Sequence, residues 1–428
     1  MAKRKHRRQK PGGGVDAPPV PEGTLQFSAD SAPESWPSVS LCMIVRNEEA
    51  NLADCIRSAG DFAAEVIVVD TGSTDRTVEI AKSLGARVKH FEWVDDFAAA
   101  RNESMKDAQG DWIFYLDADD RLSPEEVTRL KNVVASGLAD AYRCRVVSHV
   151  ADAGQSLNIV YHTRLFRNHR NVWFSGAVHE NITAAILRQG MTVAQTNVTI
   201  QHVGYAGGPE VLRQKARRNG QILQRAIGRH PDDLKLRYYL GVSLYQLADY
   251  RAAIGQFEAV IAHPPPTLNR DSQLYKAYLL LISAYTHVPA PEKARRTLQR
   301  ALELFPERRH LWITAGMFYL SQDEPEAAIS ALEHATQLSP QSDAEGESWP
   351  PGVLQDRLRA AYQRQGMKAI QQENYPQAVW SFSRFVGLAA PPQQAEGFKL
   401  LALALQKCGR QDEAIASWQA AQELESAG

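Results

Sequence analysis

Short apolar segments alternate with amphipathic segments over the first half of this chain. The apolar segments are predicted to be strands, and they cover residues 40–45, 66–70, 86–91 and 112–116. Between them, apolar side chains recur at three- and four-residue spacing, which indicates helices packed on the strands. These helices are expected to begin near Asn47, near Ser73 or Thr74, and near Phe97. Strands joined by helices favour right-handed βαβ units and a parallel sheet with helices on both faces.

Further strand-like segments follow before the pattern becomes helical. They cover residues 142–147, 159–167 and 198–203, and they are expected to extend the sheet. A helical segment then begins near residue 215. Its Lys215, Arg217 and Arg218 either reach a bound diphosphate or form a solvated face, and the solvated face is the favoured interpretation.

From about residue 234, small and aromatic residues recur as they do where the paired helices of tetratricopeptide repeats touch. The small residue in the second helix of each pair is found at Ala253, Ala294, Ala328, Ala378 and Ala414. Ala294 and Ala328 are 34 residues apart, which is the usual period of the repeat. Five helical hairpins are therefore predicted, and their concave face suits an extended peptide or another protein. Self-association and support of the first domain are open alternatives.

These patterns divide the chain into a basic, Pro- and Gly-rich tail, an α/β domain, a helical linker and a repeat domain. Their predicted bounds are 1–37, 38–210, 211–233 and 234–428. The tail cannot bury enough apolar surface to fold, so it is expected to be disordered. Its basic cluster, AKRKHRRQK, could contact anionic lipid headgroups or an acidic partner, although a solubilising role is favoured.

Composition narrows the class of function. The 428 residues carry a formal net charge of −1, which argues against a nucleic-acid-binding protein. The cysteines, Cys42, Cys55, Cys144 and Cys408, lack the spacing of a zinc site or a disulfide framework, so a reducing, cytoplasmic setting is expected. No apolar run reaches the roughly 18–20 residues that span a bilayer, so at most peripheral membrane contact is expected.

The fourth predicted strand ends in three carboxylates, Asp117, Asp119 and Asp120. Clustered anions repel each other and resist desolvation. This ending is therefore explained by a hard cation such as Mg²⁺ or Mn²⁺, bound together with substrate phosphates. The alternative is an acidic loop before a helix, because residues 123–126 match a capping box.

Polar residues also follow the other predicted strands, at the edge where open α/β sheets bind ligands. They are Asn47 and Glu48 after the first strand, Asp70 at the end of the second, and Asp95 and Asp96 after the third. A dinucleotide site or a P-loop is disfavoured, because the glycine-rich sequences of both are missing after the first strand. The pattern indicates a nucleotide-plus-metal crevice in which the cation neutralises a diphosphate.

Seven motifs, taken in order, resemble those of family 2 glycosyltransferases with the GT-A fold, in the subgroup with tetratricopeptide repeats behind the catalytic domain. They are NEE (47–49), VVDTGSTDRT (68–77), DFAAARN (96–102), GDWIFYLDADD (110–120), RLFRN (164–168), VHE (178–180) and HVGY (202–205). The resemblance implies an α/β GT-A catalytic domain with a Rossmann-like mixed sheet, followed by an all-α solenoid of tetratricopeptide repeats.

The resemblance also implies which residues bind the nucleotide-sugar donor. Asp70 lies where such enzymes bind the nucleobase. Asn47 and Glu48 fall in the loop that lines the nucleotide pocket. Arg101 and Asn102 lie where the diphosphate or the donor sugar would pass.

For the metal and the chemistry, the resemblance implies a second set of residues. Asp117 matches the first acid of the DxD motif, which faces the ribose, and Asp119 matches the second, which ligates Mn²⁺ or Mg²⁺. His202 matches a late histidine that can complete the metal shell. Glu180 is the candidate general base, with His179 beside it as a second candidate.

Structural roles are open for several of these residues. Glu180 could pair with Arg164 or Arg167, and Asp70 could cap the following helix. His179 and His202 could each be structural. For the aspartates of the DxD motif, the structural alternative is the acidic loop before a helix given above.

The function implied is a metal-dependent, inverting transfer of a hexose from a nucleoside-diphosphate donor, with UDP as the expected nucleotide. The expected acceptor is a peptide or protein held partly by the repeats. One alternative is a lipid-linked or cell-surface glycan acceptor. Another is a non-catalytic repeat scaffold whose first domain is an inactive sugar-nucleotide fold. The sequence leaves open the sugar, the acceptor atom, the metal and whether the chain forms a homo-oligomer.

Overall fold

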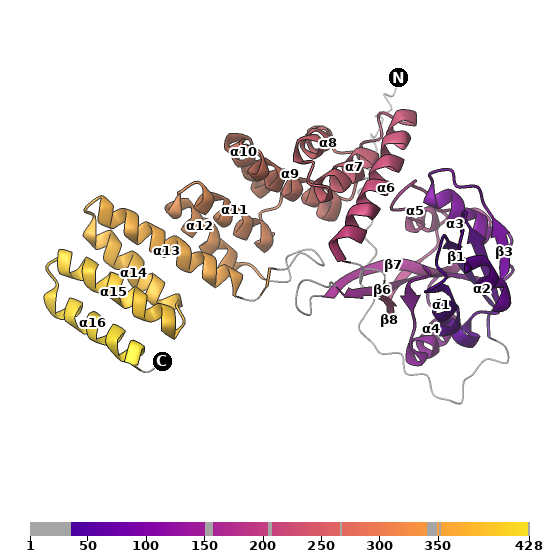
Figure 1. Cartoon of the computed structure of the whole chain (residues 1–428), viewed down its shortest axis with the longest axis horizontal. Helices are drawn as coiled ribbons and strands as arrows, with labels where there is room; N and C mark the ends of the chain where they lie inside the picture. Colours follow the sequence, from indigo (N-terminus) through magenta and orange to yellow (C-terminus); the bar gives the residue numbers. More distant parts are fainter. Residues whose placement is uncertain are drawn as a thin grey trace, which may run out of the picture. The chain divides into compact units, whose positions relative to one another are not determined.

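The structure, a computed structural model, describes residues 36–149, 157–203, 208–265, 268–339, 349–350 and 352–426 (Figure 1). The chain divides into two compact units, with the boundary between His230 and Pro231. The tail predicted for residues 1–37 lies almost entirely outside the described residues. Within the described part of the chain, no helix combines the length and the apolar character that crossing a membrane requires.

The first unit is built on a mixed sheet, which has eight strands in the described part of the chain, in the order β3-β2-β1-β4-β7-β6-β8-β5. They are β1 (Val39–Val45), β2 (Glu65–Asp70), β3 (Arg87–His90), β4 (Trp112–Tyr115), β5 (Asp120–Arg121), β6 (Ala141–His149), β7 (Leu157–Arg167) and β8 (Val193–His202). The four neighbouring strands β3, β2, β1 and β4 are parallel to one another, whereas β7 runs antiparallel to both β4 and β6. The predicted fold class, a mixed α/β sheet followed by helical repeats, is confirmed.

Helices cover both faces of the parallel strands, which explains why these strands are apolar throughout. They are α1 (Leu52–Ala59), a short 3₁₀ turn (Gly60–Phe62), α2 (Thr77–Ser83), α3 (Phe97–Met105), α4 (Pro124–Ser136) and α5 (Thr183–Arg188). The last helix of this unit, α6 (Gly208–Arg229), follows β8. In β4, Trp112 and Phe114 pack in one core with α1 and α4. Ile113 and Tyr115 pack in a second core with α3 and α5 on the opposite face, so every residue of this strand is buried.

The predicted strands are confirmed, but two predicted helix starts are wrong. α1 begins at Leu52 and not near Asn47, because Asn47 has a left-handed φ of 56° and its side chain bonds to the next loop instead of capping a helix. α2 begins at Thr77, because the N–H of Ser73 is bound by the carboxylate of Asp70. The parallel arrangement expected of the first four strands is confirmed, and the sheet becomes mixed where β7 pairs antiparallel with β4.

The second unit consists of five helix pairs in its described residues, as predicted. They are α7 (Leu234–Gln246) with α8 (Tyr250–Ala262), α9 (Tyr275–His287) with α10 (Pro291–Leu304), α11 (Arg309–Ser321) with α12 (Pro325–Gln337), α13 (Val353–Gln371) with α14 (Tyr375–Leu388), and α15 (Pro391–Lys407) with α16 (Gln411–Ser426). The five predicted alanines all lie in the second helix of a pair and are buried. At Gly241 the helices approach so closely that a Cβ would lie 2.7 Å from the Phe257 ring.

Candidate active site

The acidic segment after β4 is bonded to the end of β8. Its backbone turns through a hydrogen bond from the N–H of Asp120 to the carbonyl of Asp117 (2.9 Å). Asp120 then pairs with His202 across β5 and β8, and the carbonyl of Asp119 accepts from the N–H of Val203 (2.9 Å). The fold therefore brings His202 to acids that precede it by more than eighty residues. α4 follows directly, but its N-cap serine makes no capping hydrogen bond, so the predicted capping box is wrong.

Asp119, Asp120 and His202 form the group that could hold a metal ion in the described part of the chain. One ligand atom of each lies within 4.8 Å of the others. His202 Nδ1 lies 2.9 Å from Asp120 Oδ1 and 3.4 Å from Asp119 Oδ1. Carboxylate oxygens with an imidazole nitrogen suit Mn²⁺, and the carboxylates also suit Mg²⁺.

The electrostatics of this group also favour a cation. Burial, reinforced by Asp117 and Asp120 and only partly offset by His202, raises the pKa of Asp119 to about 6. Burial disfavours protonation of His202, but Asp120 and Asp119 outweigh it and raise the pKa of the ring. A nearby positive charge stabilises the ionised form of a buried carboxylate. The oxygen and nitrogen donors of Asp119, Asp120 and His202 therefore fit a divalent ion.

Asp117 is ionised and is held between two arginines. Its Oδ1 accepts from Arg101 Nη2 (2.6 Å) and its Oδ2 from Arg164 Nη2 (3.1 Å). Burial opposes ionisation, but the two guanidinium groups outweigh it and hold the pKa of Asp117 well below its usual range. Both guanidinium groups also lie over the ring of Tyr115, at 4.7 and 4.6 Å from its centroid.

Glu180 is bound by an arginine that the sequence did not pair with it. Its Oε1 accepts from Arg101 Nε at 2.5 Å, so the alternatives of pairing with Arg164 or Arg167 are wrong. Arg101 thus joins the candidate base to Asp117 through the two sides of one guanidinium group. His179, with a left-handed φ of 54°, is exposed beside it.

Asn102 fixes the loop that carries Glu180. Its side-chain amide donates to the carbonyl of Phe174 (3.0 Å) and accepts from the N–H of the same residue (2.8 Å). The loop then closes through a β-bridge between Ser175 and Asn181. Both ends of the Asn102 amide are therefore used to position this loop.

The predicted nucleotide-binding residues lie in two loops that are hydrogen-bonded to each other. The side chain of Asn47 accepts from the N–H of Thr74 (2.8 Å), and the N–H of Glu48 donates to the hydroxyl of Thr77 (2.7 Å). Asp70, which is 2% exposed, accepts from the N–H groups of the turn before α2 and lies 3.3 Å from His90 Nδ1. Asp70 stabilises this turn, which is compatible with the predicted nucleobase contact.

Two acids that were expected at the binding edge have structural roles. Asp96 caps α3 by accepting from the N–H of Ala99 (3.0 Å). Asp95 pairs with Arg225 of α6 and accepts from Trp93 Nε1 (3.1 Å). α6 thus packs within the first unit. The prediction that Lys215, Arg217 and Arg218 form a solvated face is only partly correct, because the positive charge of Lys215 lowers the pKa of Asp119.

Sequence reasoning placed Asp120 among the acids of a cation site and Arg164 beside Glu180, but it did not predict that Arg164 and Asp120 pair with each other. Both are buried, and Arg164 Nη2 lies 3.2 Å from Asp120 Oδ2. The sequence shows that Asp120 belongs to a cluster of acids after the fourth predicted strand. The partner arginine was visible only as part of the RLFRN motif, because its position depends on how β7 pairs with β4.

Comparisons with known proteins cover both units. A family model described as glycosyl transferase family 2 matches residues 40–191, and one described as tetratricopeptide repeat matches residues 221–281 and 291–343. The chain is 33% identical over 312 residues to a TPR repeat-containing protein of Synechococcus elongatus. This match covers 71% of this chain and 76% of that protein. It is 28% identical over 223 residues to the SPbeta prophage-derived glycosyltransferase SunS of Bacillus subtilis. This match covers 51% of this chain and 52% of SunS.

A solved structure was also found among similar folds. The crystal structure of TarS from S. aureus covers 61% of this chain and 54% of TarS, with 16% identity and a TM-score of 0.37. A similarity this weak decides nothing about function. The family assignment rests on the two family models and on the relatives found by sequence.

Proposed function

This chain belongs to glycosyltransferase family 2, with tetratricopeptide repeats behind the catalytic domain, and we propose that it transfers a sugar from a nucleoside-diphosphate donor to a peptide or protein. The transfer is metal-dependent and inverting, the nucleotide is UDP, and the sugar is a hexose. The observation that carries this proposal is the Asp119–His202 pair beside an ionised Asp117. These groups lie at the edge of the sheet where α/β folds bind ligands.

The donor is bound by the residues around this edge. Asp119 and His202 hold Mn²⁺ or Mg²⁺, and Asp117 contacts the ribose. Asp70 contacts the nucleobase, with Asn47 and Glu48 lining the same pocket. When bound, the cation stabilises the negative charge that develops on the departing diphosphate.

Arg101 contributes a positive charge next to the path of the diphosphate, and Asn102 positions the loop that faces it. Arg101 is supported in this role by its burial and by two carboxylates that hold its guanidinium group in one orientation. A donor diphosphate competes with these carboxylates for the same N–H groups, since Arg binds phosphates and carboxylates with similar geometry.

Glu180 is the general base, and His179 supports it from the exposed side of the loop. A carboxylate paired with a guanidinium group is a weak proton acceptor. Glu180 therefore exchanges Arg101 for the acceptor hydroxyl, amine or thiol before it accepts a proton. A single displacement with one base inverts the anomeric carbon.

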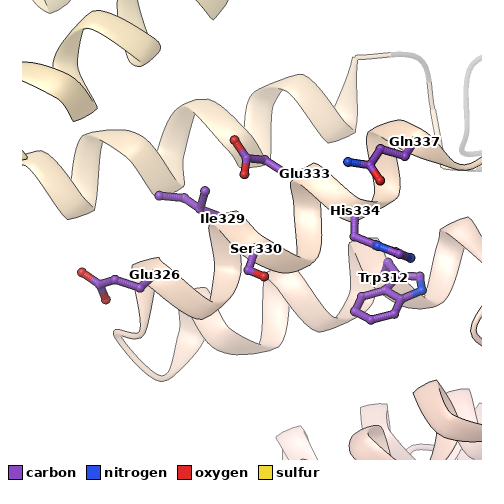
Figure 2. Close-up of a pocket in the computed structure, with 7 residues that line it drawn as sticks. All are labelled: Trp312, Glu326, Ile329, Ser330, Glu333, His334 and Gln337. Carbon is purple, nitrogen blue, oxygen red and sulfur yellow. The ribbon is translucent and has the colours of Figure 1, made fainter.

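The repeats hold the acceptor. A groove of about 510 Å³ lies on α11 and α12, lined by Trp312, Glu326, Ile329, Ser330, Glu333, His334 and Gln337 (Figure 2). Figure 2 shows the ring of His334 next to that of Trp312, with centroids 4.2 Å apart, while Glu326 and Glu333 line the part of the groove away from the indole. An aromatic surface beside two carboxylates suits a peptide segment with a basic side chain.

A transfer assay tests the proposal. The full chain is incubated with UDP-hexoses, Mn²⁺ and a peptide library that varies basic residues, and products are followed by mass spectrometry. We expect a hexose to be added to a peptide with the wild-type protein and not with Asp119→Asn. Turnover in the presence of EDTA, or equal activity of the variant, would refute the metal-dependent mechanism.

A further inference from the structure

The candidate base and the candidate metal site are joined by a continuous series of alternating charges. It runs from Glu180 through Arg101, Asp117, Arg164, Asp120 and His202 to Asp119. Each contact in the series is 3.4 Å or shorter. Arg164 is the arginine of the series that touches two acids of the segment after β4, Asp117 and Asp120.

A β-bulge aims Arg164 at these acids. On β6, Tyr142 pairs with Leu165 and Arg143 pairs with Thr163, so Arg164 is an extra residue with no opposite partner on that strand. A bulge of this kind redirects one side chain relative to the regular alternation. Arg164 is 4% exposed and directs Nη2 at both Asp117 Oδ2 and Asp120 Oδ2.

Asp120 is fully engaged by its neighbours. Its Oδ2 accepts from the N–H of Asp117 (2.9 Å) and lies by Arg164, while its Oδ1 lies 2.9 Å from His202 Nδ1. A carboxylate that binds one ring nitrogen of a histidine fixes the ring for metal binding through the other. Asp120 therefore orients His202, and Arg164 holds Asp120 in that position.

Arg164 also has donors left over. Its Nε and Nη1 are buried and have no hydrogen-bond partner among the described residues. Burying unpaired donors destabilises a fold, so a side chain of this kind is kept for a reason other than stability alone.

We propose that Arg164 is a positioning residue: it keeps Asp117 and Asp120 from binding the cation directly, so that Asp119 and His202 bind it. This inference rests on the metal site of the proposed function. Without Arg164, the two neighbouring carboxylates turn to the cation, which is then bound more tightly but in the wrong arrangement for transfer.

The test measures binding of Mn²⁺ alone, without donor or acceptor. We compare the wild type with Arg164→Gln and Arg164→Lys by calorimetry, and follow nitrogen coupling to Mn²⁺ by pulsed electron paramagnetic resonance. Loss of one positive charge beside the site makes Arg164→Gln bind Mn²⁺ about tenfold more tightly. Arg164→Lys keeps the charge but cannot bridge two carboxylates, so its affinity also rises, by a smaller factor. In both variants the imidazole coupling weakens as carboxylates replace His202.

Arg167→Gln is the matched control, because Arg167 lies on the same strand but pairs with Asp140 (3.3 Å) and is about half exposed. Its affinity and nitrogen coupling stay at the wild-type values. An Arg164→Lys variant that matches the wild type in both measurements means that only charge matters and overturns the positioning role, as does weaker Mn²⁺ binding by Arg164→Gln.

Failure of the metal site itself gives a different result. If the wild type binds no Mn²⁺ alone, the inference is overturned; the metal-dependent function is refuted only if Mn²⁺ also fails to bind together with a nucleotide sugar. If Arg164→Gln is unfolded in metal-free buffer, it is purified in Mn²⁺, where we expect a folded protein with a larger Mn²⁺-induced rise in Tm than the wild type. An equal or smaller rise overturns the inference.

Discussion

Replacing Arg101 by Met is expected to destabilise the first unit strongly. Arg101 is 7% exposed, and its guanidinium group neutralises Asp117 (2.6 Å) and Glu180 (2.5 Å). Asp117 keeps a second partner in Arg164, so the main cost comes from Glu180, whose side chain is 13% exposed. Leaving a buried charge without its partner costs about 3–5 kcal/mol.

Removing both partners should recover most of that loss. Arg101→Met combined with Glu180→Gln leaves no unpaired charge at Glu180, and replacing a buried ion pair by uncharged groups is often close to neutral. The same Met substitution at Arg167 is the control. That arginine is 45% exposed, and an exposed pair of this kind contributes about 0–1 kcal/mol.

Urea unfolding followed by hydrogen-exchange mass spectrometry of peptides from β4 reports on the first unit specifically. We expect Arg101→Met to lower the free energy of unfolding by about 3 kcal/mol or more, and the double variant to regain at least half of it. A single variant as stable as the wild type, or a double variant as unstable as the single one, would refute the conclusion that this ion pair is buried and mutually dependent.

Three further predictions concern the metal, the repeats and pH. Asp119→Asn should abolish metal-dependent turnover while hydrogen exchange in the repeats stays unchanged, and loss of repeat protection would contradict a local role. Gly316→Ala should destabilise the second unit by about 1–3 kcal/mol, because the added Cβ would lie 2.3 Å from Leu332 Cγ. Gly255→Ala, with open space around the added carbon, should instead be neutral or slightly stabilising in the same thermal assay. Burial lowers the pKa of His310 from 6.5 to about 4, so the His310 ring resists protonation while the second unit is folded. Its stability should fall as pH drops from 6.5 towards 4 and the dependence should end below that; His310→Gln should remove this part of the slope in acid titrations followed by circular dichroism.

Periodicity was enough to predict the longer strands of the first unit and the helix pairs of the second, but not the short elements β5 and α5. The apolar runs at β1, β2 and β4 were identifiable because both of their faces are buried, and the five repeat alanines because each sits where two helices touch. The acids at Asp117 and Asp119 were identifiable because a buried strand that ends in carboxylates has few structural explanations.

The contacts that determine the site were not predictable in the same way. Arg101 and Glu180 are 79 residues apart in sequence, and their pairing depends on a loop that Asn102 holds by backbone hydrogen bonds. Arg164 reaches the acids through a bulge, which has no signature in a single sequence. Asn47 adopts a left-handed conformation to join two loops, and local capping preference alone predicted a helix start there instead.

The central claim is that the acidic edge of the first unit is a metal-dependent donor site. The most direct test is a calorimetric titration of UDP-sugars into the full chain with and without Mn²⁺, together with Asp119→Asn. We predict micromolar binding that requires Mn²⁺ in the wild type and is lost in the variant. Absence of binding for every nucleotide sugar, or binding that is equally strong without the metal, would contradict it.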